Sequence, residues 1–163
     1  HGIWLLFLAV LAGLVVIVAA LRWREWTTPA RPDTAVARLV AGPGDREAAR
    51  FNLCQHKHRD NCVVDGDTIH YHGDKIRIAD INAPEISHPQ CDSEEALGDK
   101  ARGRLMALLN AGPFSLDKTE SRDVDKYGRK LRSITRGGTS LGEVLVAEGL
   151  AERWVGYRRN WCK

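Results

Sequence analysis

Several patterns that would assign a class at once are absent from this 163-residue chain. There is no internal repeat, which argues against solenoid and propeller architectures. The formal net charge is only +3, so overall charge alone does not indicate a nucleic-acid-binding protein. The acidic residues at positions 65–67 do not form an EF-hand loop, because a third ligand before the glycine is missing. The length favours one domain with an appendage.

Charged residues are also missing from residues 3–21, which are rich in Leu, Val and Ile. A stretch of nineteen such residues has the length of a membrane-spanning helix. Two interpretations remain open: a transmembrane signal anchor, which the length favours, or a secretory signal peptide cleaved after Ala20. Residues 22–50 contain three separate turn sequences with proline and predict a linker. The folded domain is therefore expected at residues 51–163.

The four cysteines bear on the cellular compartment. An even number together with an export signal favours disulfides, and four cysteines allow three pairings. Cys54 and Cys62 flank a short segment, so we expect a local bond between them. Cys91 would then bond to Cys162 and attach the C-terminal end to the domain. Disulfides indicate a periplasmic or extracellular protein, membrane-anchored or secreted, and we give them more weight than the two arginines that follow residue 21, which favour the cytoplasm.

Zinc binding is the alternative use of the first two cysteines. His56 and His58 lie between Cys54 and Cys62, which places two thiols and two imidazoles within nine residues. Structural zinc sites draw their ligand pairs from separated elements, and this spacing does not match them. Disulfides are therefore favoured.

A pair of carboxylates lies in a β-rich part of the sequence. Asp65 and Asp67 are two residues apart, so in a regular strand they share one face. Gly66 between them permits a bend that directs both side chains at one point. By itself an Asp-Gly step is also a common hairpin turn, so the pair alone does not predict a metal site.

The segment that follows adds a cation, a carboxamide and another carboxylate. Ile76 and Ile78 alternate with charged residues, which predicts a half-buried strand. Arg77 lies within this strand, and Asn82 and Glu85 follow it; we expect Arg77 and Glu85 to point toward solvent and substrate. Oxygen ligands, a fixed cation and a carboxylate at a strand end are what metal-assisted phosphodiester cleavage requires.

The remaining pattern predicts a mixed α and β domain. Asp92 with Glu95 is a capping box for a helix at about 93–110, whose apolar residues fall on one face. The other expected elements are strands at 68–71, 75–81, 114–119 and 130–135, and a second helix at 140–148.

Four sequence blocks, in their order and spacing, carry a resemblance. The blocks are V-V-D-G-D-T at 63–68, R-x-x-x-x-N-A-P-E at 77–85, D-K-Y-G-R at 125–129 and L-V-A-E-G-L-A at 145–151. Together they resemble the staphylococcal nuclease (thermonuclease) family over about residues 62–154. The resemblance implies an α+β fold in which a five-stranded OB-type β-barrel carries two or three helices, preceded here by the N-terminal hydrophobic segment.

The resemblance also implies calcium-dependent hydrolysis of phosphodiester bonds in DNA, RNA or both. Arg77 and Arg129 occupy the phosphate-binding positions of the family, and Glu85 occupies that of the proposed general base. Asp67 occupies a calcium-ligand position, and Asp65 the nearby acidic position. Nucleic acid is then the expected partner of a chain expected to be monomeric, with the membrane a further partner if the N-terminal segment is not cleaved.

The chain departs from the family at the second carboxylate ligand, which falls on Asn82. The neighbouring position, which offers a backbone carbonyl to calcium, falls on Ala83. A carboxamide provides no full charge, so we expect weaker calcium binding, compensated by Asp65 or by Asp80. We expect Lys126 and Tyr127 to line the substrate groove, which completes the predicted site.

Aromatic residues at 154, 157 and 161 alternate with arginines near the C-terminal end. Such mixtures can stack bases and hold phosphates, but we favour their packing onto the barrel beside the Cys91–Cys162 bond. Two further function classes remain open: a catalytically weakened nucleic-acid-binding module and a structural OB-fold module. The joint presence of Arg77, Glu85 and Arg129 argues against both.

Overall fold

The computed structural model describes residues 39–55, 59–119 and 122–162. The predicted anchor or signal peptide at residues 3–21 and most of the predicted linker lie outside these residues. Within the described part, no helix is both long and apolar enough to cross a membrane. The compact unit begins at Leu39, so it includes residues 39–50, which the sequence alone assigned to the linker.

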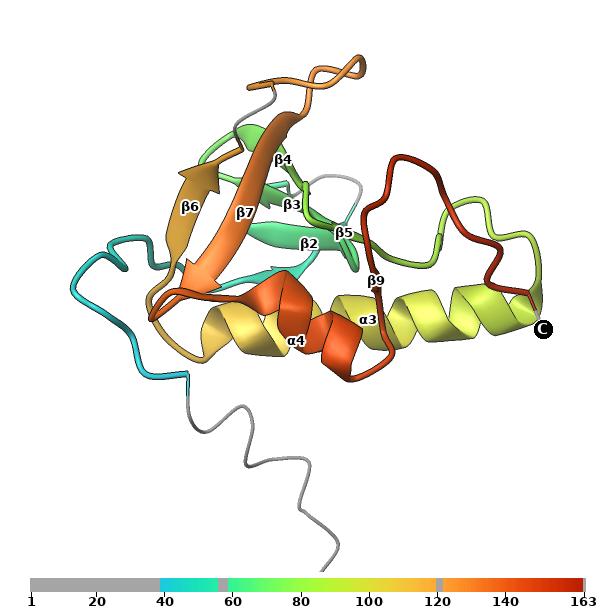
Figure 1. Cartoon of the computed structure of the whole chain (residues 1–163), viewed down its shortest axis with the longest axis horizontal. Helices are drawn as coiled ribbons and strands as arrows, with labels where there is room; N and C mark the ends of the chain where they lie inside the picture. Colours follow the sequence, from blue (N-terminus) through green and yellow to red (C-terminus); the bar gives the residue numbers. More distant parts are fainter. Residues whose placement is uncertain (1–38, 56–58, 120–121, 163) are drawn as a thin grey trace, which may run out of the picture. The chain divides into compact units, whose positions relative to one another are not determined.

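Most strands belong to one curved, mixed sheet with the order β1-β2-β3-β4-β7-β6, and β8 pairs with β7 (Figure 1). Its strands are β1 (Asn52–Leu53), β2 (Cys62–Asp65), β3 (Thr68–Tyr71), β4 (Asp74–Ile78), β6 (Ser115–Lys118), β7 (Lys130–Arg136) and β8 (Thr139–Ser140). A separate two-stranded sheet joins β5 (Ile81–Asn82) to β9 (Glu152–Arg153).

The α+β class is confirmed, but a closed barrel is not detected. The described strands pair along an open path from β1 to β6, and β6 has no hydrogen-bonded partner on its other side. The expected hairpin is present as β3 and β4, although β4 ends at Ile78 and Ile81 pairs with β9 instead. The parallel pairing of β4 with β7 aligns Arg77 with Leu131 and brings two distant sequence blocks together.

Two helices cover the sheet in the described part of the chain: α3 (Asp92–Asn110) and α4 (Leu141–Ala147). Ala101, Leu105 and Leu108 of α3 are fully buried, as the apolar spacing predicts. The capping-box prediction is wrong, because Cys91 is the N-cap residue, Asp92 is already helical, and no side chain caps the helix. The main-chain oxygen of Cys91 instead accepts hydrogen bonds from the amides of Glu94 and Glu95.

Two glycines, Gly66 and Gly98, allow the β2–β3 turn and the segment that follows β5 to approach α3. A Cβ atom on Gly66 would lie 2.6 Å from the Cβ of Ala83 and 2.7 Å from that of Ala101. A Cβ on Gly98 would lie 3.0 Å from the main-chain oxygen of Pro84. The chain turns at Gly66 and Asp67, as the sequence suggested, and close packing requires the glycine, whose φ is outside the left-handed region.

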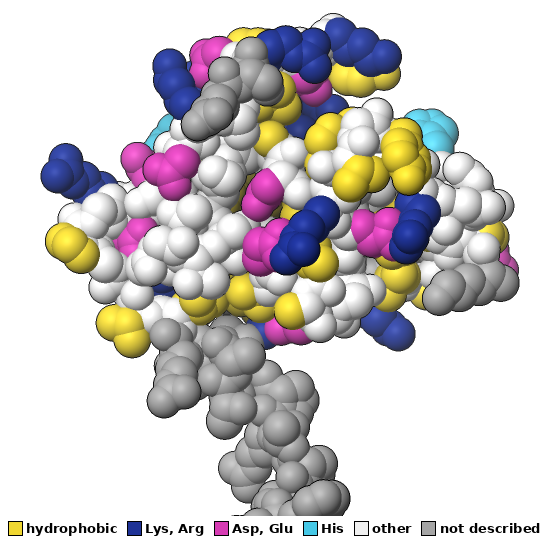
Figure 2. All heavy atoms as spheres, in the orientation of Figure 1, with side chains coloured by type: hydrophobic (Ala, Val, Ile, Leu, Met, Phe, Trp, Pro, Cys, Tyr) yellow, Lys and Arg dark blue, Asp and Glu magenta, His cyan; other side chains and the backbone are white. Residues whose placement is uncertain are grey.

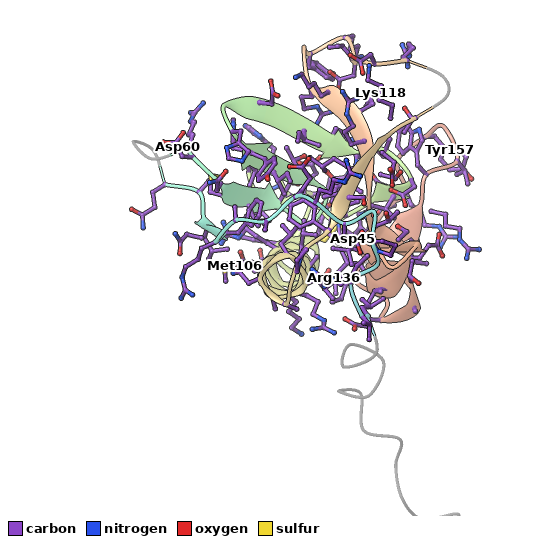
Figure 3. The ribbon with its side chains drawn as sticks, turned by 90° about the vertical axis from the view of Figure 1, so that its left-hand side faces the viewer. Asp45, Asp60, Met106, Lys118, Arg136 and Tyr157 are labelled. Atoms are coloured by element: carbon purple, nitrogen blue, oxygen red, sulfur yellow. A yellow bond between two sulfur atoms is a disulfide. The ribbon has the colours of Figure 1, made fainter. Side chains whose placement is uncertain are left out.

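One arginine in the C-terminal part of the sequence, Arg136, stabilises the fold. Arg136 is 1% exposed, and its guanidinium donates to the main-chain oxygens of Leu108, Gly112 and Pro113, where α3 ends. Figure 3 shows it beside Asp45 at this end of the helix. The burial of Arg136 lowers its pKa, and the carboxylate of Asp45 opposes that shift. Arg136 thus stabilises a helix end and is not available to bind a polyanion.

Candidate active site

The first carboxylates of the site lie at the β2–β3 turn. Asp67 is 7% exposed, and one of its carboxylate oxygens accepts a hydrogen bond from the Thr68 hydroxyl at 3.0 Å. The other oxygen accepts the amide of Ala83 at 2.8 Å. The carboxylate of Asp65 accepts the amide of Asp67 at 3.1 Å. Asp67 therefore connects this turn to the segment that leads to Glu85.

Arg77 faces the same carboxylate from β4. Its Nη1 lies 3.2 Å from Oδ2 of Asp67 and also donates to the main-chain oxygen of Ile78. The ring of Trp154 covers the guanidinium at 5.8 Å. The prediction that Arg77 points into solvent is wrong, since the residue is 7% exposed. Because an alanine here would leave the buried carboxylate without its cation, we expect Arg77→Ala to destabilise the fold.

The two aspartates give this turn an excess of negative charge. Burial and, second, the negative charge of Asp67 together raise the pKa of Asp65 to about 7, although the hydrogen bond from the amide of Asp67 opposes the shift. Arg77 supplies one positive charge to the pair. A bound cation would favour the ionised form of Asp65, so the electrostatics of the turn suit a metal ion.

This shift predicts a pH dependence of stability in a metal chelator. The folded-state pKa of Asp65 lies above the ordinary value of 3.8, so the folded state retains a proton that the unfolded state has released. The free energy of unfolding should therefore fall as pH rises from about 4 to about 7. Asp65→Asn is expected to flatten this slope, measured by denaturant unfolding across that range. Asp60→Asn, which removes an exposed carboxylate, serves as the control, and parallel slopes in wild type and Asp65→Asn would contradict the assignment.

Asn82 and Ala83 follow at the end of β5. Asn82 is 4% exposed and pairs with Glu152 of β9. It lines a cavity of about 290 Å³ together with residues of β9 and the C-terminal tail, which we define as residues 154–162. One carboxylate oxygen of Asp80 accepts the hydroxyl of Ser140 at 2.6 Å at the start of α4, and its other oxygen is buried without a hydrogen-bond partner among the described residues. Compensation for Asn82 by Asp80 stays a prediction.

Glu85 lies in the loop between β5 and α3. Its side chain is 31% exposed and forms an ion pair with Arg158 of the tail. Its amide donates to the carboxylate of Glu94 at 3.3 Å, and the amide of Gln90 donates to the same carboxylate at 2.7 Å. Glu94 is itself 3% exposed. The loop is thus fixed to the first turn of α3 by a buried acidic side chain that the sequence did not single out.

Arg129 is held by the turn that precedes β7. Its Nε donates to Oδ2 of Asp125 at 2.7 Å, while Oδ1 of Asp125 accepts the amides of Tyr127 and Arg129, each at 2.9 Å. Although burial opposes the shift, these hydrogen bonds lower the pKa of Asp125 below its ordinary value. Asp125 therefore acts as a fixed anion that orients Arg129, a role that the D-K-Y-G-R block contained but that we did not assign from sequence.

Strand register relates the two arginines. Arg77 pairs with Leu131, and Arg129 lies two residues before Leu131. Arg129 therefore lies directly before the strand that pairs with β4, in the turn that Asp125 holds. Two cations lie over the ring of Tyr127: Nζ of Lys126 is 4.9 Å and Cζ of Arg129 is 5.5 Å from the ring centroid. Tyr127 itself is 70% exposed. The structure thus places the predicted substrate-groove residues directly beside Arg129.

The C-terminal tail does not pack as expected. Tyr157 is 68% exposed, so the interpretation that it packs onto the sheet is wrong; Trp154 is 42% exposed but covers the guanidinium of Arg77 in β4, and Trp161 is half-buried. Figure 2 shows hydrophobic side chains gathered on this face, and Figure 3 places Tyr157 at the periphery. An aromatic ring that is both exposed and in contact with Arg77 is available to an unpaired base.

Both predicted disulfides are present in the structure. Cys54 is bonded to Cys62, and Cys91 is bonded to Cys162. The second bond joins the N-cap residue of α3 to the end of the tail, across 71 residues of sequence. The zinc alternative is thereby excluded for these cysteines, because bonded sulfurs cannot act as thiolate ligands.

The oxygen donors at the β2–β3 turn and at the end of β5 are of the kinds that calcium binds. Calcium binds carboxylate, carboxamide and main-chain oxygens, which Asp65, Asp67, Asn82 and Ala83 can provide. The raised pKa of Asp65 shows that the turn is short of positive charge. Among the residues that the structure describes, however, no three His, Cys, Asp or Glu side chains are grouped to hold a metal ion. Calcium would therefore depend on two carboxylates and on neutral oxygens.

Comparisons with known proteins show which family and which relatives this chain resembles. A model of the staphylococcal nuclease homologue family matches residues 75–162, which include Arg77, Glu85 and Arg129 but not Asp65 and Asp67. The SPbeta prophage-derived endonuclease YokF of Bacillus subtilis (strain 168) is 37% identical over 102 residues, covering 60% of this chain and 34% of that protein. Endonuclease YncB of the same organism is 35% identical over 102 residues, covering 60% of this chain and 48% of its own length. The chain thus spans less than half the length of either curated relative.

Proposed function

Because this chain belongs to the staphylococcal nuclease homologue family, we propose that it is a calcium-dependent nuclease that hydrolyses phosphodiester bonds of DNA, RNA or both. The observation that carries this proposal is the contact between Asp67 and Arg77, which is fastened to the amide of Ala83, two residues before Glu85. A buried carboxylate, a guanidinium and a half-exposed carboxylate are thereby held on neighbouring segments. YokF and YncB are named as endonucleases, which supports the same activity.

In the mechanism that we propose, Glu85 accepts a proton from the attacking water. A well-placed general base contributes about 10²–10⁴-fold to a rate. Arg77 and Arg129 stabilise the negative charge that develops on the phosphate oxygens, because a planar guanidinium stays charged and matches phosphate in a bidentate manner. Asp125 keeps Arg129 oriented for this contact.

Asp65, Asp67, Asn82 and the main-chain oxygen of Ala83 would hold calcium, which when bound neutralises phosphate charge and orients the scissile group. Lys126 and Tyr127 would contact the substrate on the side of Arg129. Trp154, exposed and in contact with the Arg77 guanidinium, would stack on a base next to the cleaved bond.

A plasmid-digestion assay with calcium and with chelator tests this proposal. We expect cleavage in calcium and none in chelator. Cleavage that persists in chelator would refute the calcium requirement. An absence of cleavage in both conditions, together with binding of labelled oligonucleotide, would favour the second candidate, a nucleic-acid-binding module; the replacement of a carboxylate ligand by Asn82 is the observation that keeps this candidate open.

We further propose that the chain acts as a monomer outside the cytoplasm, anchored in the membrane or secreted. The two disulfides support this location, because such bonds persist in oxidising compartments. We also propose that β2, β3, β4, β7 and β6 form the five-stranded OB-type barrel of the family, in a partly open form.

The substitution at Asn82 predicts a high calcium requirement. Asn82→Asp adds a full negative charge one residue before Ala83, whose amide binds Asp67, and is expected to lower the calcium concentration for half-maximal cleavage by roughly an order of magnitude. Cleavage rates titrated against calcium for the wild type and the variant measure this shift. Asn52→Asp, which adds the same charge on the exposed strand β1, is the control. If the midpoint of Asn82→Asp equals that of the wild type, Asn82 is not a calcium ligand.

A further inference from the structure

The proposed general base has a partner that lies far away in sequence. Arg158 of the tail forms an ion pair with Oε1 of Glu85 through its Nη1. The Arg158 side chain is 58% exposed and that of Glu85 is 31% exposed. An ion pair with this exposure normally contributes little to the free energy of unfolding, because two long side chains must be ordered to make it. The question is whether other contacts already provide that order.

The Glu85 side of the pair is fixed to α3. The buried carboxylate of Glu94 binds the amides of Glu85 and Gln90, and the segment before Glu85 rests on Gly98. Both contacts come from the first two turns of the helix. The main chain at Glu85 is therefore held in place before its side chain meets any partner.

The Arg158 side of the pair is fixed to the same end of α3. Four residues after Arg158, Cys162 is bonded to Cys91, the N-cap residue of the helix. The next residue, Arg159, forms an ion pair with Glu152 of β9 at 2.5 Å. Figure 1 shows the tail running from β9 back to the start of α3. The tail is thus attached at its start through the pairing of β9 with β5 and at its end through the disulfide, and Arg158 lies on the span between them.

We propose that Arg158 is a positioning residue for Glu85, and that the Cys91–Cys162 bond keeps it within reach. Arg158 binds one carboxylate oxygen and leaves the other oxygen to accept the proton of the attacking water. Such orientation raises the rate of the chemical step without adding a contact to the substrate. This inference rests on the proposed function, because it assigns a role relative to the proposed base.

Steady-state kinetics on the full chain test the proposal. Arg158→Ala is expected to lower kcat by about tenfold with KM within about twofold of wild type, since only the orientation of Glu85 is lost. Arg158→Lys should regain part of kcat, because an ammonium can still reach a carboxylate. Arg102→Ala is the control: it also removes one arginine from an ion pair, here with Asp99 on the surface of α3, but it leaves the tail and the contact with Glu85 in place, so its kcat should stay within about twofold of wild type.

The disulfide provides the second arm of the experiment. The double variant Cys91→Ser, Cys162→Ser should lower kcat as Arg158→Ala does, and combining all three changes should lower it no further, because both act through one contact. If the cysteine variant does not fold, the Arg158 series decides alone.

If the wild-type chain is active, three results would overturn the proposal. An Arg158→Ala variant with wild-type kcat would show an ordinary surface ion pair, and a raised KM with unchanged kcat would show a substrate contact instead. An increase in kcat would show that Arg158 blocks the base. A wild-type chain that cleaves nothing refutes the proposed function itself and this inference with it, whereas an active wild type with an equally active Arg158→Ala refutes the inference alone.

Discussion

Glu85→Gln is expected to reduce the cleavage rate at saturating calcium by about 10²–10⁴-fold, the range for loss of a general base. The carboxamide has nearly the same shape as the carboxylate but accepts a proton poorly. The Glu85 side chain is 31% exposed, and its main chain is held by Glu94 independently of the carboxylate. The fold should therefore be retained, as measured by circular dichroism and thermal unfolding.

Glu95→Gln is the matched control for this variant. It makes the same change on an exposed residue in the first turn of α3, ten residues away in sequence. Its cleavage rate should match that of the wild type. A folded Glu85→Gln variant that cleaves at a rate near the wild type would show that another group accepts the proton, and the role assigned to Glu85 would have to be withdrawn.

Arg129→Lys is expected to lower kcat by about 10²–10³-fold, the typical cost of removing one donor that stabilises a transition state. In the wild type, Nε of Arg129 already binds Asp125, which leaves the two terminal nitrogens for a phosphate. A lysine has a single ammonium, and Asp125 would bind it. The conservative replacement therefore keeps the charge and the anchoring ion pair but loses the donors that face the substrate.

Arg102→Lys tests whether this effect is specific. Arg102 also forms an ion pair with an aspartate, Asp99, at 2.9 Å, but it lies on the surface of α3. The control should keep wild-type kcat and a wild-type melting temperature. Comparable kcat values for Arg129→Lys and Arg102→Lys would show that Arg129 serves only as a general positive charge.

Arg77 and Arg129, to which the resemblance assigns the same phosphate-binding role, have different surroundings in the structure. Arg77 is buried between Asp67 and Trp154, so its charge also balances a carboxylate that the fold cannot leave unpaired. Arg129 is held at one nitrogen by Asp125 and keeps its other donors free of intramolecular hydrogen bonds among the described residues. Arg129 is therefore the better position at which to separate catalysis from stability.

The sequence by itself determined the features that depend on local spacing. Asp65 and Asp67, the hairpin of β3 and β4, and the apolar face of α3 follow from repeats of two and of about four residues. The local Cys54–Cys62 bond follows from the short distance between its partners along the chain. The ordered blocks also predicted the family, which the match over residues 75–162 confirms.

The tertiary structure alone decided which side chains meet across the chain. Trp154 covers the guanidinium of Arg77, Ser140 binds the carboxylate of Asp80, and Arg158 is the partner of Glu85. Each of these contacts joins residues at least sixty positions apart. Spacing along a strand or helix specifies the face on which a side chain lies, but its neighbour there is set by the pairing of β5 with β9 and by the disulfide that returns the tail to α3.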